Sequence, residues 1–257
     1  MNTDSVDWEK YKENITGISQ VTFGDNHVGG CNIYGDPATE HPKMWKYLAD
    51  TLGIKSVIDV GCGFGFHLKY FKEILGLDVL GIEGSSKVVD ICLLPNDIIS
   101  HDYTNGSYIP EKVYDMCWCI EFVEHVEEKY RENFIDTFKK CKYLTMTHGM
   151  PNQGGYHHVN CQPPEYWVSL LQKHGFTLLD DLTSIARNIA NVDCEDYIKW
   201  RADLSSDKPY RGPAAQANDI HKTDPMVPWF AQNGLIFINK NLINTMIFYP
   251  DRNITKL

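Results

Sequence analysis

The sequence predicts a doubly wound α/β fold, in which a mostly parallel sheet carries helices on both faces. Short apolar strand patterns alternate with amphipathic helix patterns from about residue 41 to residue 182. Glycine-rich or polar turns follow several strand patterns, which places a ligand crevice at the carboxyl edge of the sheet. A length of 257 residues suits one α/β domain with additional segments.

The first elements of this alternation follow one another closely. Residues 41–52 have apolar side chains at helical spacing, with Pro42 suited to the first turn and Gly53 placed to end the helix. The apolar run at 56–60 is typical of a buried strand, and residues 66–75 return to helical spacing. A glycine-rich turn joins this strand to this helix, which indicates the first unit of a parallel sheet.

The same alternation continues through the rest of the chain. Short apolar runs predict further strands at 78–82, 97–100, 114–120, 142–147, 176–182 and 235–239. Helical spacing between these runs predicts helices at 86–92, 126–140 and 163–174. The last of these helices has two prolines at its start and a glycine after it, which are typical boundaries.

We expect one main domain over residues 41–257, preceded by a segment that caps the site or binds substrate, residues 1–40. Residues 183–233 break the alternation, because they are acidic and aromatic with one expected helix at 195–202. They contain too few periodic apolar residues for a core of their own. The interpretation is a lid-like insertion that covers the site.

The charge balance restricts the partners. The chain has 24 Lys and Arg against 34 Asp and Glu, a formal net charge of −10, which disfavours nucleic acid as a partner. No apolar run approaches the ~20 residues of a membrane helix, and the acidic N-terminus is unlike a secretory signal. The cysteines form no CxxC pair, which favours reduced thiols in a cytoplasmic protein; they are Cys31, Cys62, Cys92, Cys117, Cys119, Cys141, Cys161 and Cys194.

The strongest chemical signal is a glycine-rich turn between a strand and a helix. The segment VIDVGCGFGF runs from Val57 to Phe66, and Glu83 ends the next strand pattern. Glycines let a ligand approach the backbone, and the start of the helix offers unpaired N–H groups. A carboxylate at the end of the next strand can accept both hydroxyls of a ribose. The pattern therefore predicts a ligand that contains a nucleoside.

Two kinds of cofactor compete for this turn. A dinucleotide fingerprint would have glycine where Phe66 stands, and Asp59 would place negative charge near a pyrophosphate. The same charge suits a ligand that carries an ammonium and a sulfonium. On these motifs, residues 40–182 and 235–239 resemble the class I S-adenosylmethionine-dependent methyltransferases. The resemblance implies a Rossmann-like fold with a seven-stranded sheet, and S-adenosyl-L-methionine as the cofactor.

The resemblance also implies how the cofactor is held. Glu83 would bind the ribose hydroxyls, Asp102 would lie by the adenine amino group, and residues 121–122 would close over the adenine or the methionine moiety. By its residue type alone, Asp102 is as well explained as a turn or N-cap residue. The expected cofactor-binding residues are Asp59, Gly61, Cys62, Gly63, Gly65, Glu83, Gly84, Asp102, Tyr103, Glu121 and Phe122.

A second group of polar residues follows the strand at 114–120. Glu121, Glu124 and His125 would share one face of a helix that begins here. With His158 from a later loop, they could bind Mg²⁺, Mn²⁺ or Zn²⁺. The segment resembles that of metal-dependent 2′-O-methyltransferases of small RNAs and of ubiquinone-pathway O-methyltransferases. The alternative is structural, with the acids at a helix start and the histidine packed.

The loop at 148–160 carries the candidate bases. An alcohol needs help to lose its proton, whereas a sulfonium needs no activation. We expect His157 or His158 to accept that proton, with His148 behind them. Adjacent histidines point in different directions, so at least one of the pair packs within the loop.

These observations predict an S-adenosylmethionine-dependent methyltransferase that acts on oxygen. The expected acceptor is a hydroxyl of a small metabolite or of a sugar unit in a glycan, methylated by in-line transfer. Two alternatives stay open: a metal-dependent 2′-O-methyltransferase of RNA, and a non-catalytic module that binds the cofactor. The sequence does not indicate an oligomeric state.

Overall fold

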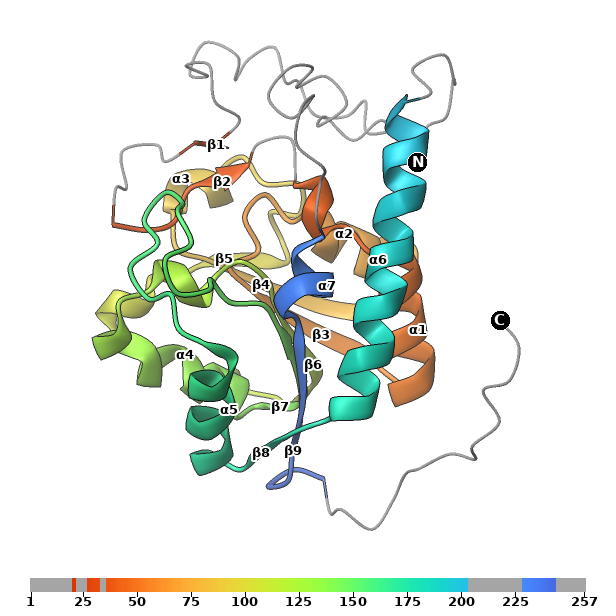
Figure 1. Cartoon of the computed structure of the whole chain (residues 1–257). Coiled ribbons are helices and arrows are strands. Elements are labelled where there is room, and N and C mark those ends of the chain that lie inside the picture. The colour runs from red at the N-terminus through yellow and green to blue at the C-terminus, as the bar shows by residue number, and fades with distance from the viewer. Residues whose placement is uncertain (1–19, 22–26, 33–35, 203–227, 244–257) are drawn as a thin grey trace.

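A computed structural model describes residues 20–21, 27–32, 36–202 and 228–243 (Figure 1). Seven strands form one sheet in the order β5-β4-β3-β6-β7-β9-β8. They are β3 (Ser56–Val60), β4 (Asp78–Glu83), β5 (Ile98–Ser100), β6 (Tyr114–Cys119), β7 (Cys141–Met146), β8 (Phe176–Leu178) and β9 (Leu235–Asn239). Neighbours are parallel, except that β9 runs antiparallel to both β7 and β8. The predicted mostly parallel, seven-stranded sheet is confirmed.

Helices cover both faces of this sheet, as predicted (Figure 1). One face carries α1 (Pro42–Leu52), α2 (Phe66–Glu73) and α6 (Asp180–Ala202), and the other carries α4 (Arg131–Phe138) and α5 (Pro164–Lys173). Two short helices, α3 (Ser86–Val89) and α7 (Trp229–Asn233), complete this layer structure. A separate two-stranded sheet joins β1 (Gln20–Val21) to β2 (Cys31–Asn32).

The alternation of side chains along the central strand β6 divides the core in two. Met116 and Trp118 pack with residues of α1, α2 and α6, whereas Cys117 and Cys119 pack with residues of α4 and α5. A strand that is buried on both faces reads as a continuous apolar run, which is why the sequence predicts it well. Seven cysteines are free thiols: Cys31, Cys62, Cys92, Cys117, Cys119, Cys141 and Cys161.

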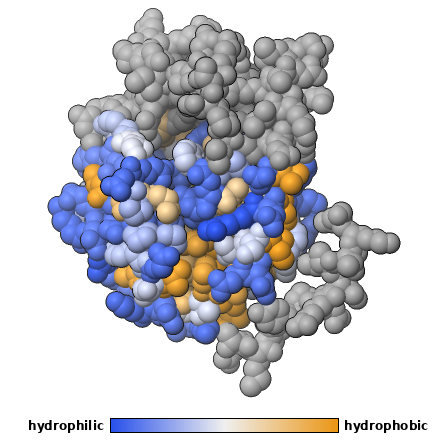
Figure 2. All heavy atoms as spheres, viewed as in Figure 1, coloured by the Kyte–Doolittle hydropathy of each residue, from blue (hydrophilic) through white to orange (hydrophobic). Residues whose placement is uncertain are grey.

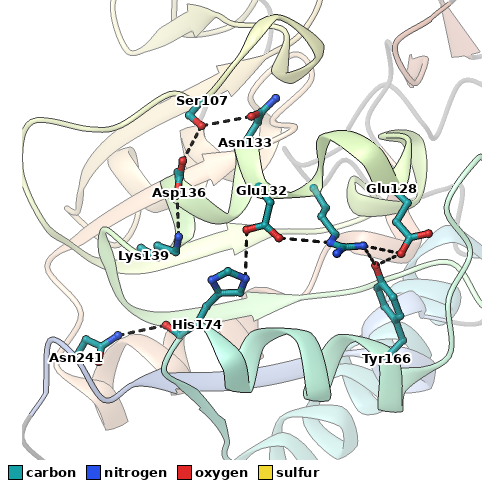
Figure 3. A network of polar contacts seen from close by, with 10 residues as sticks. Ser107, Glu128, Glu132, Asn133, Asp136, Lys139, Tyr166, His174 and Asn241 are labelled. Atoms are coloured by element: carbon teal, nitrogen blue, oxygen red, sulfur yellow. Dashed lines mark hydrogen bonds and ion pairs between the residues drawn. The ribbon is translucent and has the colours of Figure 1, made fainter.

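Polar contacts tie the outer helices α4 and α5 together (Figure 3). Arg131 donates to Glu128 at 2.6 Å and to the Tyr166 hydroxyl at 3.2 Å, and His174 lies 3.3 Å from Glu132. Each of these exposed contacts adds little to the stability of the fold. The face of the molecule in Figure 2 is largely hydrophilic. The contacts join Tyr166 near the start of α5 and His174 at its end to the segment around α4.

One strand and two helices differ most from the sequence prediction. The strand expected at 176–182 ends at Leu178, because α6 begins at Asp180. The helix expected at 126–140 begins at Arg131, after two 3-10 turns at Val123–His125 and Glu128–Tyr130. The helix expected at 195–202 begins at Asp180, because the small residues Ala186 and Ala190 let it pack against the face that carries α1. The rest of the predicted lid, residues 203–227, lies outside the described residues. Within them, no helix combines the length and the apolar character that crossing a membrane requires.

A buried histidine at the start of α1 predicts how stability depends on pH. The His41 ring has no exposed surface and no hydrogen-bond partner among the described residues, and burial lowers its pKa to about 3. The unfolded chain therefore binds a proton that the native chain excludes once the pH falls below about 6.5. We expect unfolding free energy to drop by up to about 1.4 kcal/mol per pH unit from this residue between pH 6 and pH 4.

Urea unfolding at several pH values measures this effect. The variant His41→Leu is expected to have a shallower slope than the wild type, because leucine keeps an apolar side chain at the site and binds no proton. Equal slopes in the two proteins would show that His41 does not contribute.

Candidate active site

A cavity of about 700 Å³ opens at the carboxyl ends of β3, β4 and β6. Its volume suits a small molecule rather than a macromolecular surface. The glycine-rich turn forms one wall, the loop after β7 forms another, and residues before α1 form a third. The cavity thus lies at the edge of the sheet where the sequence places the ligand crevice.

Backbone geometry explains the glycines of the turn. Gly61 has φ 78°, and a Cβ there would lie 2.5 Å from the Phe122 ring. Gly65 has φ 85°, and its Cβ would lie 2.7 Å from Ile98. Only glycine combines this left-handed backbone with such close approach. The turn therefore presents bare backbone to the cavity, and α2 begins directly after it.

Glu83 holds the position that a ribose-binding acid requires. It ends β4 with only 7% of its surface exposed, and it lines the cavity. Its carboxylate accepts hydrogen bonds from the N–H of Gly63 at 3.0 Å and from the N–H of Ser85 at 2.9 Å. These two bonds fix both oxygens and leave further lone pairs for ligand hydroxyls.

Two expected cofactor residues lie away from the cavity. Asp59 is buried beneath the turn, its Oδ2 has no hydrogen-bond partner among the described residues, and burial and the Glu83 charge raise its pKa. Gly65 is buried against Ile98 and is absent from the cavity lining. Both support the turn from behind. The other predicted cofactor residues line the cavity: Gly61, Cys62, Gly63, Glu83, Gly84, Asp102, Tyr103, Glu121 and Phe122.

Asp102 lies where both a capping residue and a cofactor-binding residue would lie. It caps the 3-10 turn Tyr103–Asn105 by accepting from the Thr104 N–H at 2.8 Å, and it also lines the cavity. Burial alone would raise the pKa of Asp102, but hydrogen bonds from Thr104 and His27 lower it below the usual range. The aspartate is therefore a charged acceptor at this end of the cavity.

Residues 27–31 form a wall that the sequence did not identify residue by residue. His27 Nε2 lies 2.9 Å from Asp102 Oδ2, and Val28 and Cys31 approach Gly84 and Gly63. A Cβ at Gly29 would lie 2.5 Å from the His125 ring. The pair of glycines at 29–30 was the one available signal, since it indicates a turn or a close approach. Asp36, Thr39 and His67, which also line the cavity, were missed as well; Trp229 lines it too and belongs to the segment 183–233 that was expected to cover the site.

Glu121 does not begin a helix. Its φ is 51°, a left-handed conformation, and its N–H donates to Thr147 Oγ1 at 2.8 Å. The chain then makes the 3-10 turn Val123–His125. The expected helical face of Glu121, Glu124 and His125 is therefore wrong, although all three side chains stay at the same end of the sheet.

Glu124, His125 and His158 converge. One possible ligand atom from each lies within 4.8 Å of the others. Glu124 has no exposed surface, and neither of its oxygens has a hydrogen-bond partner among the described residues. His125 Nδ1 is also buried and has no hydrogen-bond partner among these residues. Buried polar groups without partners are rare in proteins, and a bound water or ion commonly satisfies them. The donor set fits a divalent cation.

Electrostatics at this cluster point the same way. Burial and the neighbouring Glu121 charge raise the pKa of Glu124, and burial lowers the pKa of His125 to about 4. A cation would stabilise the charged form of Glu124. It would also bind the His125 imidazole, which its lowered pKa keeps neutral. Glu121, also expected as a ligand, stands beside the cluster rather than within the group of three.

The three candidate bases separate clearly. His157 and His158 line the cavity, and His157 Nδ1 donates to the His125 carbonyl at 3.0 Å. His148 is fully buried near Trp167 and is absent from the cavity lining. A substrate in the cavity therefore has no access to His148, and the two adjacent histidines His157 and His158 stay as candidate bases.

Comparison with known proteins gives one family match and several similar structures. Residues 58–142 match the family model of the methyltransferase domain. A SAM-dependent methyltransferase from Archaeoglobus fulgidus is 21% identical, with 55% of this chain and 70% of that chain covered and a TM-score of 0.43. The methyltransferase domain of bacterial CtHen1-C is 18% identical, with 56% and 87% covered and a TM-score of 0.44.

The plantazolicin methyltransferase BpumL, in complex with SAH, is 18% identical, with 54% of this chain and 65% of that chain covered and a TM-score of 0.40. No curated protein sequence matches the chain significantly. The domain match spans the glycine-rich turn, Glu83 and Asp102, which line one cavity. Residues 58–142 thus match a methyltransferase domain, and this segment contains the motifs that resemble the class I S-adenosylmethionine-dependent methyltransferases.

Proposed function

We propose that this chain methylates a hydroxyl group of a small metabolite or of a sugar unit in a glycan. The observation that carries the proposal is that His125, His157 and His158 line the same cavity as the glycine-rich turn. When bound, S-adenosylmethionine supplies a methyl group that needs no further activation. The chain must therefore place the acceptor oxygen and provide a group that takes its proton.

The cofactor half of the cavity fits a nucleoside. Glu83 would accept the ribose hydroxyls, since both of its oxygens are already oriented by backbone N–H groups. Asp102 would accept from the adenine amino group, with Tyr103 and Phe122 beside it; these two rings lie 5.7 Å apart. The bare backbone of the turn would receive the amino-acid part.

His157 is the better placed of the two candidate bases. Because its Nδ1 donates to a carbonyl, the neutral ring carries its lone pair on Nε2, which can accept a proton. His158 belongs to the cluster with Glu124 and His125 and would serve as a ligand when a cation is bound. We therefore assign proton acceptance to His157 and metal binding to His158.

A divalent cation on this cluster would place positive charge beside the acceptor oxygen and favour its ionised form. Glu124, His125 and His158 offer one carboxylate and two imidazoles, a set that suits Mn²⁺ or Zn²⁺ better than Mg²⁺. This part of the proposal rests on the unpartnered buried atoms of Glu124 and His125.

RNA is the weaker acceptor candidate. The described residues that line the cavity include five carboxylates, Asp36, Glu83, Asp102, Glu121 and Glu127, and neither lysine nor arginine. A phosphodiester chain gains most of its affinity from such basic residues. Sugar hydroxyls need no such charge and suit the acidic and aromatic lining.

An assay for S-adenosylhomocysteine release tests the proposal. Purified protein with S-adenosylmethionine is expected to release product with pooled sugars, glycans or small alcohols, and not with RNA oligonucleotides. Activity is expected to fall at least tenfold after chelation and to return with Mn²⁺ or Zn²⁺. Activity that chelation leaves unchanged would exclude the metal, whereas cofactor binding without turnover on any pool would favour the non-catalytic module.

A further inference from the structure

Glu121 has an unfavourable backbone conformation for its residue type. Among the described residues, three other than glycine have positive φ: Glu121 at 51°, Asn152 at 67° and His157 at 53°. A Cβ crowds the backbone in this region. Asparagine tolerates the region because its short polar side chain can hydrogen-bond to nearby backbone, whereas glutamate adopts it rarely. A residue keeps such a conformation only where its surroundings enforce it, and such residues cluster at functional sites.

One hydroxyl makes two hydrogen bonds to Glu121. Thr147 Oγ1 accepts from the Glu121 N–H at 2.8 Å and donates to Glu121 Oε1 at 2.9 Å. The hydroxyl thus bonds to the backbone and to the side chain of the same residue. Thr147 itself is fully buried, and its N–H donates to the Cys119 carbonyl at 3.1 Å, which extends the pairing of β6 and β7. The clamp is therefore anchored in the sheet.

The turn at Glu121 decides where the following residues lie. Phe122 packs against Gly61 of the glycine-rich turn, where a Cβ would come within 2.5 Å of its ring. Glu124 and His125 follow in the 3-10 turn and meet His158. An extended or helical Glu121 would send these residues elsewhere, so this one backbone angle sets both the cofactor wall and the acceptor wall.

We propose that Thr147 is the positioning residue of this site, whose hydroxyl holds Glu121 in its left-handed conformation and thereby aligns Phe122 with the glycine-rich turn and Glu124 with His125 and His158. The test of this proposal by kcat rests on the proposed function, whereas the test by the free energy of unfolding does not.

The chain supplies a matched control for the test. Thr145 is also fully buried, lies two residues earlier on β7 and has a hydroxyl without a hydrogen-bond partner among the described residues. Thr145 lies on β7 and Thr147 directly follows its last residue, so Thr147→Val and Thr145→Val remove the same atom two residues apart, but only the first removes the clamp. Thr147→Ser keeps the hydroxyl and tests for rescue.

We expect Thr147→Val to lower kcat at least tenfold, with kcat measured at a temperature well below the Tm of each protein. We also expect Thr147→Val to weaken the rise in Tm that Mn²⁺ induces. Thr147→Ser is expected to stay within about threefold of the wild type, and Thr145→Val to match it. A Thr147→Val protein with wild-type kcat and a wild-type response to Mn²⁺ would overturn the proposal. A loss that occurs equally in Thr145→Val would do the same.

A double-mutant cycle separates this proposal from the proposed function. In the Glu121→Gly background the left-handed turn needs no clamp, so Thr147→Val is expected to change the free energy of unfolding less than it does in the wild type. Additive effects of the two substitutions would overturn the clamp. A wild-type protein without turnover on any acceptor would instead contradict the proposed function, and the cycle would still decide the role of Thr147.

Discussion

The variant Glu83→Ala is expected to bind S-adenosylmethionine at least about 100-fold more weakly than the wild type. Two hydroxyl hydrogen bonds to a charged acceptor are worth about 3 kcal/mol together, and 1.4 kcal/mol corresponds to a tenfold change in Kd. Removal of the carboxylate also frees the Gly63 N–H, which it holds at 3.0 Å, so the turn loses its support. Isothermal titration with S-adenosylmethionine and S-adenosylhomocysteine measures the loss.

Two further variants make this result specific. Glu83→Gln keeps one acceptor oxygen of similar size and is expected to show an intermediate affinity. Glu73→Ala removes an exposed acid at the end of α2 and is expected to bind like the wild type. If Glu83→Ala bound the cofactor with unchanged affinity, the ribose assignment would be wrong.

The variant Glu124→Met is expected to abolish the stabilisation by Mn²⁺ or Zn²⁺ while raising the Tm of the metal-free protein. A buried carboxylate whose oxygens lack partners costs about 1–3 kcal/mol, and methionine fills a similar volume without polar atoms. A metal at 100 times its Kd stabilises the wild type by about 2.7 kcal/mol, and this gain requires the ligand.

Thermal unfolding with chelator, and then with each metal, measures both effects. Glu111→Met replaces an exposed glutamate far from the cluster in sequence and controls for the loss of one negative charge. A lower Tm for metal-free Glu124→Met would show that the carboxylate has a partner in the apo protein. A metal response equal to that of the wild type would remove Glu124 from the ligand set.

Elements whose pattern is local could be predicted from the sequence. The strands at Ser56–Val60 and Leu235–Asn239 have the predicted bounds, because apolar runs end at turns that glycine or polar residues enforce. Glu83 could be placed for the same reason, since its position follows from a strand, a glycine-rich turn, a helix and a second strand.

The turn at Glu121 could not be predicted, because its cause lies 26 residues away in the chain at Thr147. A glutamate followed by two apolar residues and a second acid is typical of a helix start, and local propensity contains no information on a distant hydroxyl. The contribution of His27 and Gly29 to the cavity was missed for the same reason. These contacts depend on tertiary packing across the edge of the sheet.

The position of β9 has a consequence for how the chain is made. This strand lies between β7 and β8 in the sheet, but residues 179–234 must be synthesised after β8 before β9 exists. At about 5–20 residues per second, translation takes several seconds to reach it. During that interval the nascent chain carries unpaired edges on β7 and β8, which can pair with other chains. Pairing of β9 with β7 and β8 therefore comes last in the synthesis of this sheet and covers both edges at once.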